Sequence, residues 1–487
     1  MSFAELPPDA DDAPAKVDGI SRGRLRRSAP LAALSARTAS EALVVGLRSK
    51  VTGTDKTEFY VRTAERYAEL LGHSKGALMK AGQMLSFVSA APAVPEEFQA
   101  IYQAALTRLR DDAPPMAPEL ARAVLERELG QRTESVFAQF DWEPLAAASI
   151  GQVHAAQLHD GRAVAVKIQY PGVADAIEAD LKNSELLATF FGLLFGLSAR
   201  KASFDLRGMA HELGIRITEE LDYRLEAANQ AEFADIYRGH PFIRVPEVIG
   251  ELCTGRVLTQ ELVQGKSWSE AIACDGDLRS RWAEAIYRFV YGTNLRFCMF
   301  NADLHPGNYL FHDDGSVSFL DFGCVKRLRR EQVDVIISVG RACMRGDVLG
   351  TWRACVEGEF CRSTDPVTPE EVYVFWRESW ELFWAEQPFT ITPECATRWI
   401  EQKYSPTGPS ANAFRYFTAS PEYAAMGRIE LTTASLVAEL HATNYWGSMA
   451  DEFFEGKAPL TALGKLDHAF FEDSQMRHNH AWLASLD

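Results

Sequence analysis

The fold of this chain is constrained most by three short motifs that occur in a fixed order and lie far apart in the sequence. The first, VAVK at residues 164–167, ends an apolar run with Lys167. The second is NADLHPGN at residues 301–308, and the third is DFG at residues 321–323, after another apolar run. A single motif of this kind is common by chance. Together they indicate a fold that gathers one lysine, one amide and two carboxylates at a single site.

The residue types in these motifs match the parts of a protein-kinase active site. In kinases a strand lysine holds the α- and β-phosphates of ATP, and an aspartate bridges magnesium to the β- and γ-phosphates. Lys167 and Asp321 are candidates for these two roles. Asp303 and Asn308 keep the spacing of the kinase catalytic loop, in which the aspartate faces the nucleophile and the asparagine holds magnesium. The motifs therefore predict an α+β, bilobal, protein-kinase-like fold that binds ATP and Mg²⁺.

The expected secondary structure places each motif in a suitable context. Residues 149–156 and 162–169 are predicted to form a hairpin around the turn Asp160-Gly161. Further strands are expected over residues 256–262, 309–312 and 317–320, and helices over about 173–236 and after about residue 330. Glu261, in the first of these strands, is a further candidate for nucleotide binding.

An acidic segment precedes the strand that carries Glu261. If residues 217–226 form a helix, Glu219, Asp222 and Glu226 fall at i, i+3 and i+7 and share one face. A solvated face is the alternative, but such a face usually carries compensating lysines, and this segment supplies only Arg224. We therefore predict that Glu226 pairs with Lys167, as a helix glutamate does in kinases.

Composition narrows the class of protein. The chain has 487 residues, 47% of them hydrophobic, so it can bury a large core, and its formal net charge of −17 argues against a nucleic-acid partner. Eight scattered cysteines predict buried thiols in a reducing compartment. The longest apolar run, residues 186–199, is too short to cross a bilayer, and the N-terminus lacks the features of a signal peptide. We expect a bacterial cytoplasmic protein, or one peripheral on the inner face of the membrane.

The chain resembles the UbiB (ADCK) family over roughly residues 20–440, and two further segments are the most diagnostic part of this resemblance. Lys80-Ala81-Gly82-Gln83 resembles the KxGQ signature of the family. The Ala-rich segment Ala146, Ala147, Ala148 and Ser149 stands where ordinary kinases carry a glycine-rich loop, and it is a candidate for nucleotide binding. The resemblance also aligns Glu220 and Asp222 with the ExD element of the family, Glu226 with its lysine-pairing glutamate, and Asp303, Asn308 and Asp321 with its catalytic and metal-binding residues.

The resemblance implies a particular domain order. Residues 1–20 are rich in Pro, Asp and Ala and are expected, from this composition, to be a disordered tail. By the resemblance, 21–130 would be a helical KxGQ extension, 131–262 a kinase-like N-lobe with a helical insertion, and 263–487 an enlarged helical C-lobe with a C-terminal extension. The extension would lie across the active site and place Lys80 and Gln83 near the phosphates and the ExD carboxylates.

The residues themselves leave two questions open: which acidic side chains face the site, and what structure the Ala-rich segment forms. Side chains two apart on a regular helix point about 200° away from each other, so Glu220 and Asp222 face one site only if the helix starts or distorts there, and Glu219 remains a rival of Glu220. The Ala-rich segment restricts the backbone more than glycine does, which suggests altered nucleotide selectivity. Its alternative is the start of a helix with Ser149 as the cap.

The motifs of a protein-substrate platform are missing. After DFG the sequence continues as CVKRLRR at residues 324–330 and then becomes helical, without the activation segment that ordinary kinases place before an APE motif. Asn301 and Ala302 replace the usual histidine and arginine of the catalytic loop. These features favour a Mg-dependent ATPase or a small-molecule or lipid phosphotransferase. The resemblance adds a role in isoprenoid-quinone (ubiquinone-type) or other lipid metabolism.

Two alternative functions remain open. One is a nucleotide-gated scaffold, or pseudokinase, which would bind a partner or lipid without useful catalysis. The other is a protein kinase. Retention of all four motif residues favours catalysis, because a scaffold need not keep them all; they are Lys167, Asp303, Asn308 and Asp321. A lipid or quinone precursor is the expected partner beside the nucleotide, and a homodimer is left open.

The basic segment at residues 21–56 generates the first testable prediction. It carries eight Arg and Lys residues against Glu41 and Asp55, and its interleaved apolar residues allow an amphipathic helix that lies on anionic lipid. We expect binding to cardiolipin-containing vesicles that weakens as salt is raised, because salt screens the attraction. Vesicle co-sedimentation measures this, with neutral vesicles as the control. No binding at low salt would contradict the prediction and favour a solvated surface helix.

Overall fold

The computed structural model describes residues 116–148, 150–174, 177, 221–404, 408, 410–418 and 420–473. The chain divides into two compact units, and the second, Ala117–Ile168 with Glu219–Asp487, contains nearly all of the described residues. The elements of the fold and of the site belong to this second unit. The predictions made for segments 1–20 and 21–56, for Lys80 and Gln83, and for Ser149, Glu219 and Glu220 lie outside the described residues.

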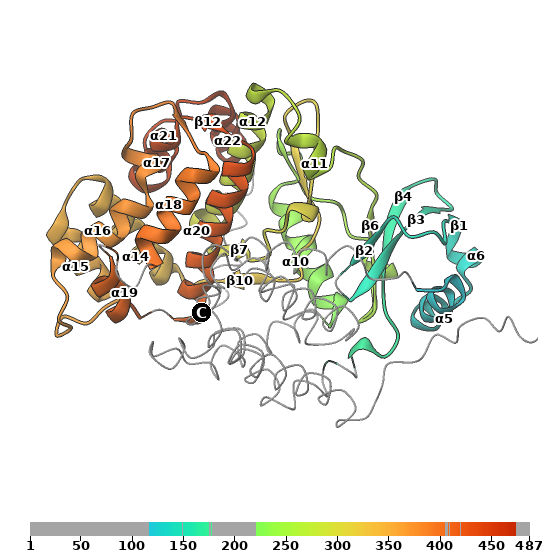
Figure 1. Ribbon diagram of the computed structural model, residues 1–487. Helices are drawn as coiled ribbons and strands as arrows, with labels where there is room; N and C mark the ends of the chain where they lie inside the picture. The colour runs from blue at the N-terminus through green and yellow to red at the C-terminus, as the bar shows by residue number, and fades with distance from the viewer. Residues whose placement is uncertain are drawn as a thin grey trace, which may run out of the picture. The chain divides into compact units, whose positions relative to one another are not determined.

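The first part of the unit is a five-stranded sheet in the order β1-β3-β4-β6, with β2 paired to β3 (Figure 1). Two helices precede it and a third lies between its last two strands in sequence. The elements are α5 (Pro118–Leu129), α6 (Thr133–Val136), β1 (Phe137–Phe140), β2 (Ala146–Ala148), β3 (Gly151–Leu158), β4 (Ala163–Gln169), α10 (Tyr223–Ile236) and β6 (Val257–Glu261). The predicted hairpin is confirmed, since β3 and β4 are neighbours joined at Gly161, whose φ of 90° suits glycine.

Alternation along β4 decides where Lys167 points. Val164, Val166 and Ile168 are fully buried, and Lys167 lies between the last two, on the opposite face of the strand. β4 also pairs antiparallel with β6, with Lys167 opposite Leu258. The three apolar side chains fix the register of β4, because a slip of one residue would turn the lysine into the apolar core and away from its carboxylate partners.

Helix α10 begins later than the sequence predicted. Asp222 has an extended backbone and is the N-cap, with its side chain accepting a hydrogen bond from the backbone N–H of Arg224 at 3.0 Å. Tyr223 is therefore the first helical residue, and the expected helical face shared by Asp222 and Glu226 is wrong. The error has a local cause, because an aspartate that caps its own helix cannot also lie on a face of that helix.

The second part of the unit contains the DFG and catalytic-loop motifs on short strands around a buried helix. Its elements are β5 (Ile243–Arg244), η2 (Gly250–Leu252), α11 (Trp268–Ala271), α12 (Gly276–Tyr287), the π-helical turn η3 (Arg288–Gly292), α13 (Thr293–Phe297), β7 (Met299–Asn301), η4 (Pro306–Asn308), β8 (Tyr309–Phe311), β9 (Val317–Phe319) and β10 (Val325–Arg327). The strands predicted over 256–262, 309–312 and 317–320 are confirmed as β6, β8 and β9. β8 and β9 pair antiparallel, and β7 pairs with β10.

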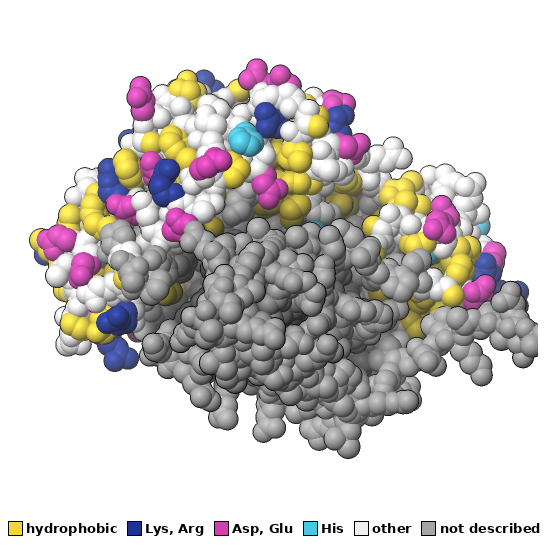
Figure 2. All heavy atoms as spheres, viewed as in Figure 1, with side chains coloured by type: hydrophobic (Ala, Val, Ile, Leu, Met, Phe, Trp, Pro, Cys, Tyr) yellow, Lys and Arg dark blue, Asp and Glu magenta, His cyan; other side chains and the backbone are white. Residues whose placement is uncertain are grey.

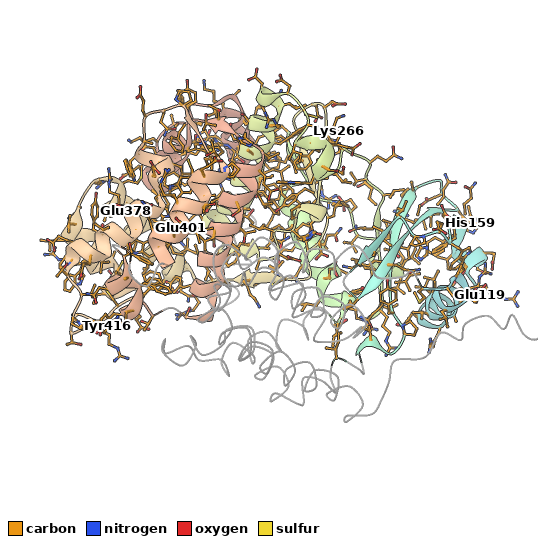
Figure 3. The ribbon with its side chains drawn as sticks, viewed as in Figure 1. Glu119, His159, Lys266, Glu378, Glu401 and Tyr416 are labelled. Atoms are coloured by element: carbon orange, nitrogen blue, oxygen red, sulfur yellow. The ribbon has the colours of Figure 1, made fainter. Side chains whose placement is uncertain are left out.

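The last part of the unit is helical. It comprises α14 (Arg330–Met344), α15 (Val348–Glu357), α16 (Pro369–Ser379), α17 (Glu381–Trp384), β11 (Phe389–Thr390), α18 (Pro393–Tyr404), α19 (Ala411–Tyr416), α20 (Pro421–Glu439), β12 (Thr443–Asn444), α21 (Trp446–Ala450), the π-helical turn η5 (Asp451–Glu455) and α22 (Ala462–Asp473). Among the described residues after 330, the structure is helical apart from connecting loops and the two-residue pair β11 and β12, as predicted. Glu378, Glu401 and Tyr416, labelled in Figure 3, come from α16, α18 and α19 of this group.

Aromatic packing joins the strands of the second part to its buried helix. Phe289 stacks on Phe319 with ring centroids 3.7 Å apart, and Phe322 of the DFG motif is fully buried with its ring centroid 4.9 Å from that of Phe233 on α10. All eight cysteines lie among the described residues; they are free thiols, five of them buried. On the face shown in Figure 2, acidic and basic side chains are interspersed over the described surface.

A buried network of charges holds α22 against the helix α12 and its π-helical extension. Arg288 is fully buried and contacts both Glu284 and Glu452 at 2.8 Å. Asp467 of α22 is also fully buried and accepts from Arg296 and from His240, the latter at 3.1 Å. Burial opposes the charge of Asp467, but the nearby cations dominate and lower its pKa to about 2.

This network generates a stability prediction. Asp467 lies 3.6 Å from the buried Arg288 and also pairs with the partly exposed Arg296. Asp467→Asn removes this negative charge and leaves both guanidinium groups undercompensated, so the free energy of unfolding at pH 7 should fall by about 3 kcal/mol. Because the folded-state pKa of Asp467 lies below its ordinary value of 3.8, the contribution is present above that value and is lost as the pH falls toward about 2. Denaturant unfolding at several pH values measures both effects.

The matched control is Glu472→Gln, on the same helix. Glu472 pairs with His468 at 3.0 Å, and both side chains are more than half exposed, so this change should alter stability little. Equal effects of the two substitutions at pH 7 would contradict the assignment of a stabilising role to the buried network.

Candidate functional site

The centre of the candidate site is Lys167 on β4, held between two carboxylates. Its Nζ donates to Oε1 and Oε2 of Glu226 on α10, at 2.8 and 3.0 Å, and to Oδ2 of Asp321 at 3.2 Å. The side chain of Lys167 is 14% exposed and that of Glu226 is 5% exposed, so this ion pair is largely shielded from water. The pairing expected between Lys167 and Glu226 is therefore present in the structure, although their residues lie far apart in sequence.

The electrostatics of this cluster keep Lys167 charged. Burial by itself lowers the pKa of Lys167, but the carboxylates of Asp321 and Glu226 outweigh it and hold that pKa well above its ordinary value. The ring of Tyr223, the first residue of α10, adds a face 5.0 Å from Nζ. A fixed ammonium group on a strand is suited to hold phosphate oxygens.

Asp321 is oriented by its own motif as well as by the lysine. Its Oδ1 accepts from the backbone N–H of Gly323 at 2.9 Å, while Oδ2 faces Lys167. The side chain is 29% exposed, so it is more accessible than Glu226. Asp321 thus combines a fixed orientation with access to solvent, which a metal-binding carboxylate needs.

Asp303 and Asn308 lie at the two ends of one short loop. The loop leaves β7 after Asn301, and it ends in the turn η4, where Gly307 N–H donates to Nδ1 of His305 at 2.9 Å. Nδ2 of Asn308 is 3.4 Å from the backbone oxygen of Asp303, so the loop closes on itself. The backbone oxygen of Asn308 accepts from Leu320 N–H at 3.0 Å, immediately before Asp321. The structure therefore brings Asn308 and Asp321 to neighbouring positions.

The Ala-rich segment is a strand, which decides between the two interpretations of it. Ala146, Ala147 and Ala148 form β2 and pair with Val153, Gln152 and Gly151 of β3. The helix-start alternative is wrong, because the three alanines are extended and hydrogen-bonded into an antiparallel pair. A glycine-rich loop of a kinase also joins two antiparallel strands, and the alanines lie on the first strand of such a pair. Their contact with a nucleotide stays a prediction.

Gly151, the first residue of β3, was not selected from the sequence. A Cβ atom added to it would lie 2.3 Å from the carbonyl oxygen of Ile168 on the neighbouring strand β4 and 2.9 Å from Oη of Tyr223. Only glycine allows this close approach. The residue thus lets β3 lie tightly against the strand that carries Lys167, and the IGQ run at residues 150–152 was the only sequence signal of it.

The remaining predicted residues take different positions. Glu261 is the last residue of β6, exposed and paired through its backbone with Val164 of β4 and with the carbonyl of Glu247. Asp222 caps α10, four residues before Glu226. Lys80, Gln83, Ser149 and Glu220 lie outside the described residues, so their relation to the site remains a prediction.

The segment after DFG is short and regular. Val325, Lys326 and Arg327 form β10 and pair with β7, and α14 begins at Arg330. The chain therefore passes from DFG directly into a strand and a helix.

Two absences among the described residues bear on cofactors and membranes. Within the described ranges, no three His, Cys, Asp or Glu side chains gather closely enough to hold a metal ion by themselves. In the same part of the chain, none of the helices combines the length and the apolar character that crossing a membrane requires.

The fold and this cluster together define a kinase-like protein. A model of the ABC1 atypical kinase-like domain matches residues 108–353, just over half of the chain. The chain therefore belongs to the ABC1 atypical kinase-like, or UbiB, family. This assignment confirms the family resemblance and the predicted α+β kinase-like fold class.

Similar proteins occur in several organisms. The atypical kinase COQ8B, mitochondrial, of Rattus norvegicus is 37% identical over 286 residues, which cover 58% of this chain and 52% of that protein. The protein ACTIVITY OF BC1 COMPLEX KINASE 1, chloroplastic, of Arabidopsis thaliana is 33% identical over 282 residues, 56% of this chain and 39% of that protein. The chain thus spans about half of the rat protein and less of the plant protein.

A solved structure is similar over a larger share of the chain. The complex structure of Rv3197-erythromycin from Mycobacterium tuberculosis has a TM-score of 0.58 and 28% sequence identity, and the match covers 85% of this chain and 98% of that one. The likeness extends the fold comparison beyond residues 108–353.

The raised pKa of Lys167 generates a prediction about its reactivity. A protonated amine is not a nucleophile, so wild-type Lys167 should resist brief acylation at pH 9. The double variant Glu226→Gln and Asp321→Asn removes both carboxylates, leaves burial unopposed, and should raise modification of Lys167 several-fold. Mass spectrometry of the peptides measures it, with the exposed Lys465 as an internal reference.

The control for this experiment is Asp235→Asn on the same helix α10. Asp235 is exposed and contacts Arg238, so its substitution should leave the labelling of Lys167 unchanged. Equal labelling of Lys167 in the wild type and the double variant, relative to Lys465, would contradict the assigned electrostatics.

Proposed function

We propose that this protein binds ATP with Mg²⁺ and acts as an ATPase or as a phosphotransferase toward a small molecule or lipid. The observation that carries the proposal is the contact of Lys167 with both Glu226 and Asp321, because it aligns the phosphate-binding cation with the metal-binding carboxylate. In kinases the lysine–glutamate pair and the DFG aspartate must both be in place for activity. Family membership supports ATP binding independently of this geometry.

The residues present fit the proposed cofactor. Magnesium prefers oxygen ligands and takes one or two carboxylates from the protein, with phosphate oxygens and waters completing its shell. The carboxylate of Asp321 and the amide of Asn308 are such ligands, and Asp321 contacts the ammonium group of Lys167. A site of this kind needs no cluster of three acidic or histidine ligands, so it is compatible with the absence of such a cluster among the described residues.

Each side chain would have one task. Lys167 would hold the α- and β-phosphates, and Glu226 would keep that ammonium group in place. Asp321 and Asn308 would hold Mg²⁺, which supplies neutralisation of the phosphate charge when it is bound. Asp303 would orient the attacking hydroxyl group or water and accept its proton. The alanines of β2 would cover the phosphates, and Glu261 would lie near the base of the nucleotide.

The short segment after DFG bears on the acceptor. β10 and α14 leave no platform for a protein substrate in the described residues after Asp321, so water, a small molecule or a lipid is the favoured acceptor. A role in isoprenoid-quinone or other lipid metabolism at the inner face of the membrane comes from the family resemblance and from the basic segment 21–56. The nucleotide-gated scaffold is the second candidate, since the same contacts would also bind ATP without turnover.

The proposal predicts Mg-dependent release of ADP that depends on the central cluster. Lys167→Ala and Asp321→Asn should each lower the rate about 100-fold or more, because each removes a charge that stabilises the transferring phosphoryl group. Anionic liposomes with phenolic quinone-precursor mimics should raise the wild-type rate. A coupled ADP assay measures these rates, with Glu472→Gln as the surface control.

Two outcomes would contradict the enzymatic proposal. One is the absence of Mg-dependent ADP release from wild-type protein with and without liposomes. The other is a cell in which Asp321→Asn abolishes ADP release but leaves the physiological role intact, which would favour the scaffold.

A further inference from the structure

Two buried asparagines from different elements hold the DFG segment. Nδ2 of Asn301, on β7, donates to the backbone oxygen of Asp321 at 2.6 Å. Nδ2 of Asn229, on α10, donates to the backbone oxygen of Phe322 at 3.1 Å. Asn301 is 5% exposed and Asn229 is 3% exposed. Two consecutive carbonyl groups of the motif are therefore held by side chains from two different elements.

The contacts of the other end of each amide fix its orientation. Oδ1 of Asn301 accepts from the backbone N–H of Asp303 at 2.9 Å, and Oδ1 of Asn229 accepts from Nη2 of Arg327 at 3.1 Å. Each amide thus faces a donor with its oxygen and an acceptor with its nitrogen, and a flipped amide would face like groups at both ends. Asn301 in this way ties the catalytic loop to DFG.

We propose that Asn229 and Asn301 are positioning residues that keep Asp321 oriented for Mg²⁺ in the absence of an activation segment. The inference rests on the proposed function, because it assigns these residues to the magnesium site of the same reaction. The pair is called the asparagine clamp here.

The clamp restricts the rotations that would turn Asp321 away. With the carbonyls of Asp321 and Phe322 both held, a flip of the peptide between them would break buried hydrogen bonds and leave polar groups unsatisfied. Phe322 adds a steric restraint, because it is fully buried against Phe233 of the same helix that carries Asn229. The bond from Gly323 N–H to Oδ1 then sets the rotation of the carboxylate.

The clamp also links Asp321 to the lysine anchor. Asn229 follows Glu226 by one helical turn, so the face of α10 that holds Lys167 also holds DFG. Arg327 contacts Asn229 and Glu232 of α10 from β10, and β10 pairs with β7, which carries Asn301. These contacts form a closed ring. Helix α10 contacts both DFG and β10, and β7 also contacts both of them. An ordinary kinase positions the corresponding helix and motif through its activation segment.

The test compares magnesium dependence in Asn229→Ala and Asn301→Ala with that of the wild type. Each variant loses the buried hydrogen bond that holds one carbonyl group of DFG. The Mg²⁺ concentration that gives half of the magnesium-dependent gain in ATP-analogue binding should therefore rise about three- to tenfold. Nucleotide binding without Mg²⁺ should change less than about twofold, because the clamp touches neither the phosphate-binding lysine nor its glutamate. Hydrogen exchange of the Gly323 amide in nucleotide-free protein should become faster, a readout independent of activity.

The controls address folding and specificity. Asn294→Ala removes an asparagine that is also 3% exposed, but its amide contacts Met426 instead of DFG, and it should leave the magnesium dependence unchanged. Asn229→Asp keeps the volume and the acceptor for Arg327 while losing the donor to Phe322, so it carries the test if an alanine variant does not fold.

The outcomes separate the clamp from the proposed function. If wild-type protein binds the ATP analogue equally with and without Mg²⁺, the proposed function fails. Suppose instead that wild-type binding of the analogue depends on Mg²⁺. If the folded Asn229 and Asn301 variants then need the same Mg²⁺ concentration as the wild type, and their Gly323 amide exchanges at the wild-type rate, the proposed clamp is wrong. The proposal is also wrong if Asn294→Ala raises the required Mg²⁺ concentration as much as the clamp variants do. The higher Mg²⁺ requirement would then come from lost stability and not from lost contacts with DFG.

Discussion

The site depends on the ion pair between Lys167 and Glu226 and on its extension to Asp321. A lysine in a largely buried position stays charged only because two carboxylates face it, and each carboxylate in turn tolerates burial because of the lysine. The three residues come from β4, α10 and the DFG loop, so the two contacts of Lys167 join three parts of the fold. Any movement of α10 away from the sheet would leave a buried charge without its counterion.

Several local features support that pair. Asp222 caps α10, so the helix starts where Tyr223 and Glu226 both reach Lys167. Gly151 permits β3 to lie close to β4. On the other side, the pairing of β7 with β10 brings the catalytic loop and the segment after DFG together within a few residues. Each of these features is a local contact close to the site, so together they can position its residues without an activation segment.

The sequence was informative where chemistry and periodicity agreed. Lys167, Asp303, Asn308 and Asp321 were selected by spacing, and the apolar run that ends in Lys167 predicted the strand that carries it. Glu226 followed from the need of that lysine for a counterion on a helix. The start of α10 was mispredicted because acidic residues are good caps and also acceptable helix residues, and only tertiary contacts decide between the two.

Other features had no periodic signal. β7 and β10 have three residues each, too few to show alternation, and they form only because the chain brings them together. The roles of Asn229 and Asn301 depend on carbonyl groups of a distant motif, which no pattern of side chains reveals. Asn301 was visible only as a departure from the histidine of ordinary kinases.

Lys167 and its two carboxylates are assigned here to a binding site for ATP and Mg²⁺. Calorimetric titration with a non-hydrolysable ATP analogue tests this assignment in wild-type protein and in Lys167→Ala, each with and without Mg²⁺. We expect saturable one-site binding in the wild type that strengthens with Mg²⁺, and at least about tenfold weaker binding in Lys167→Ala. Equal affinity of the two proteins for the analogue in the presence of Mg²⁺ would show that the assignment is wrong.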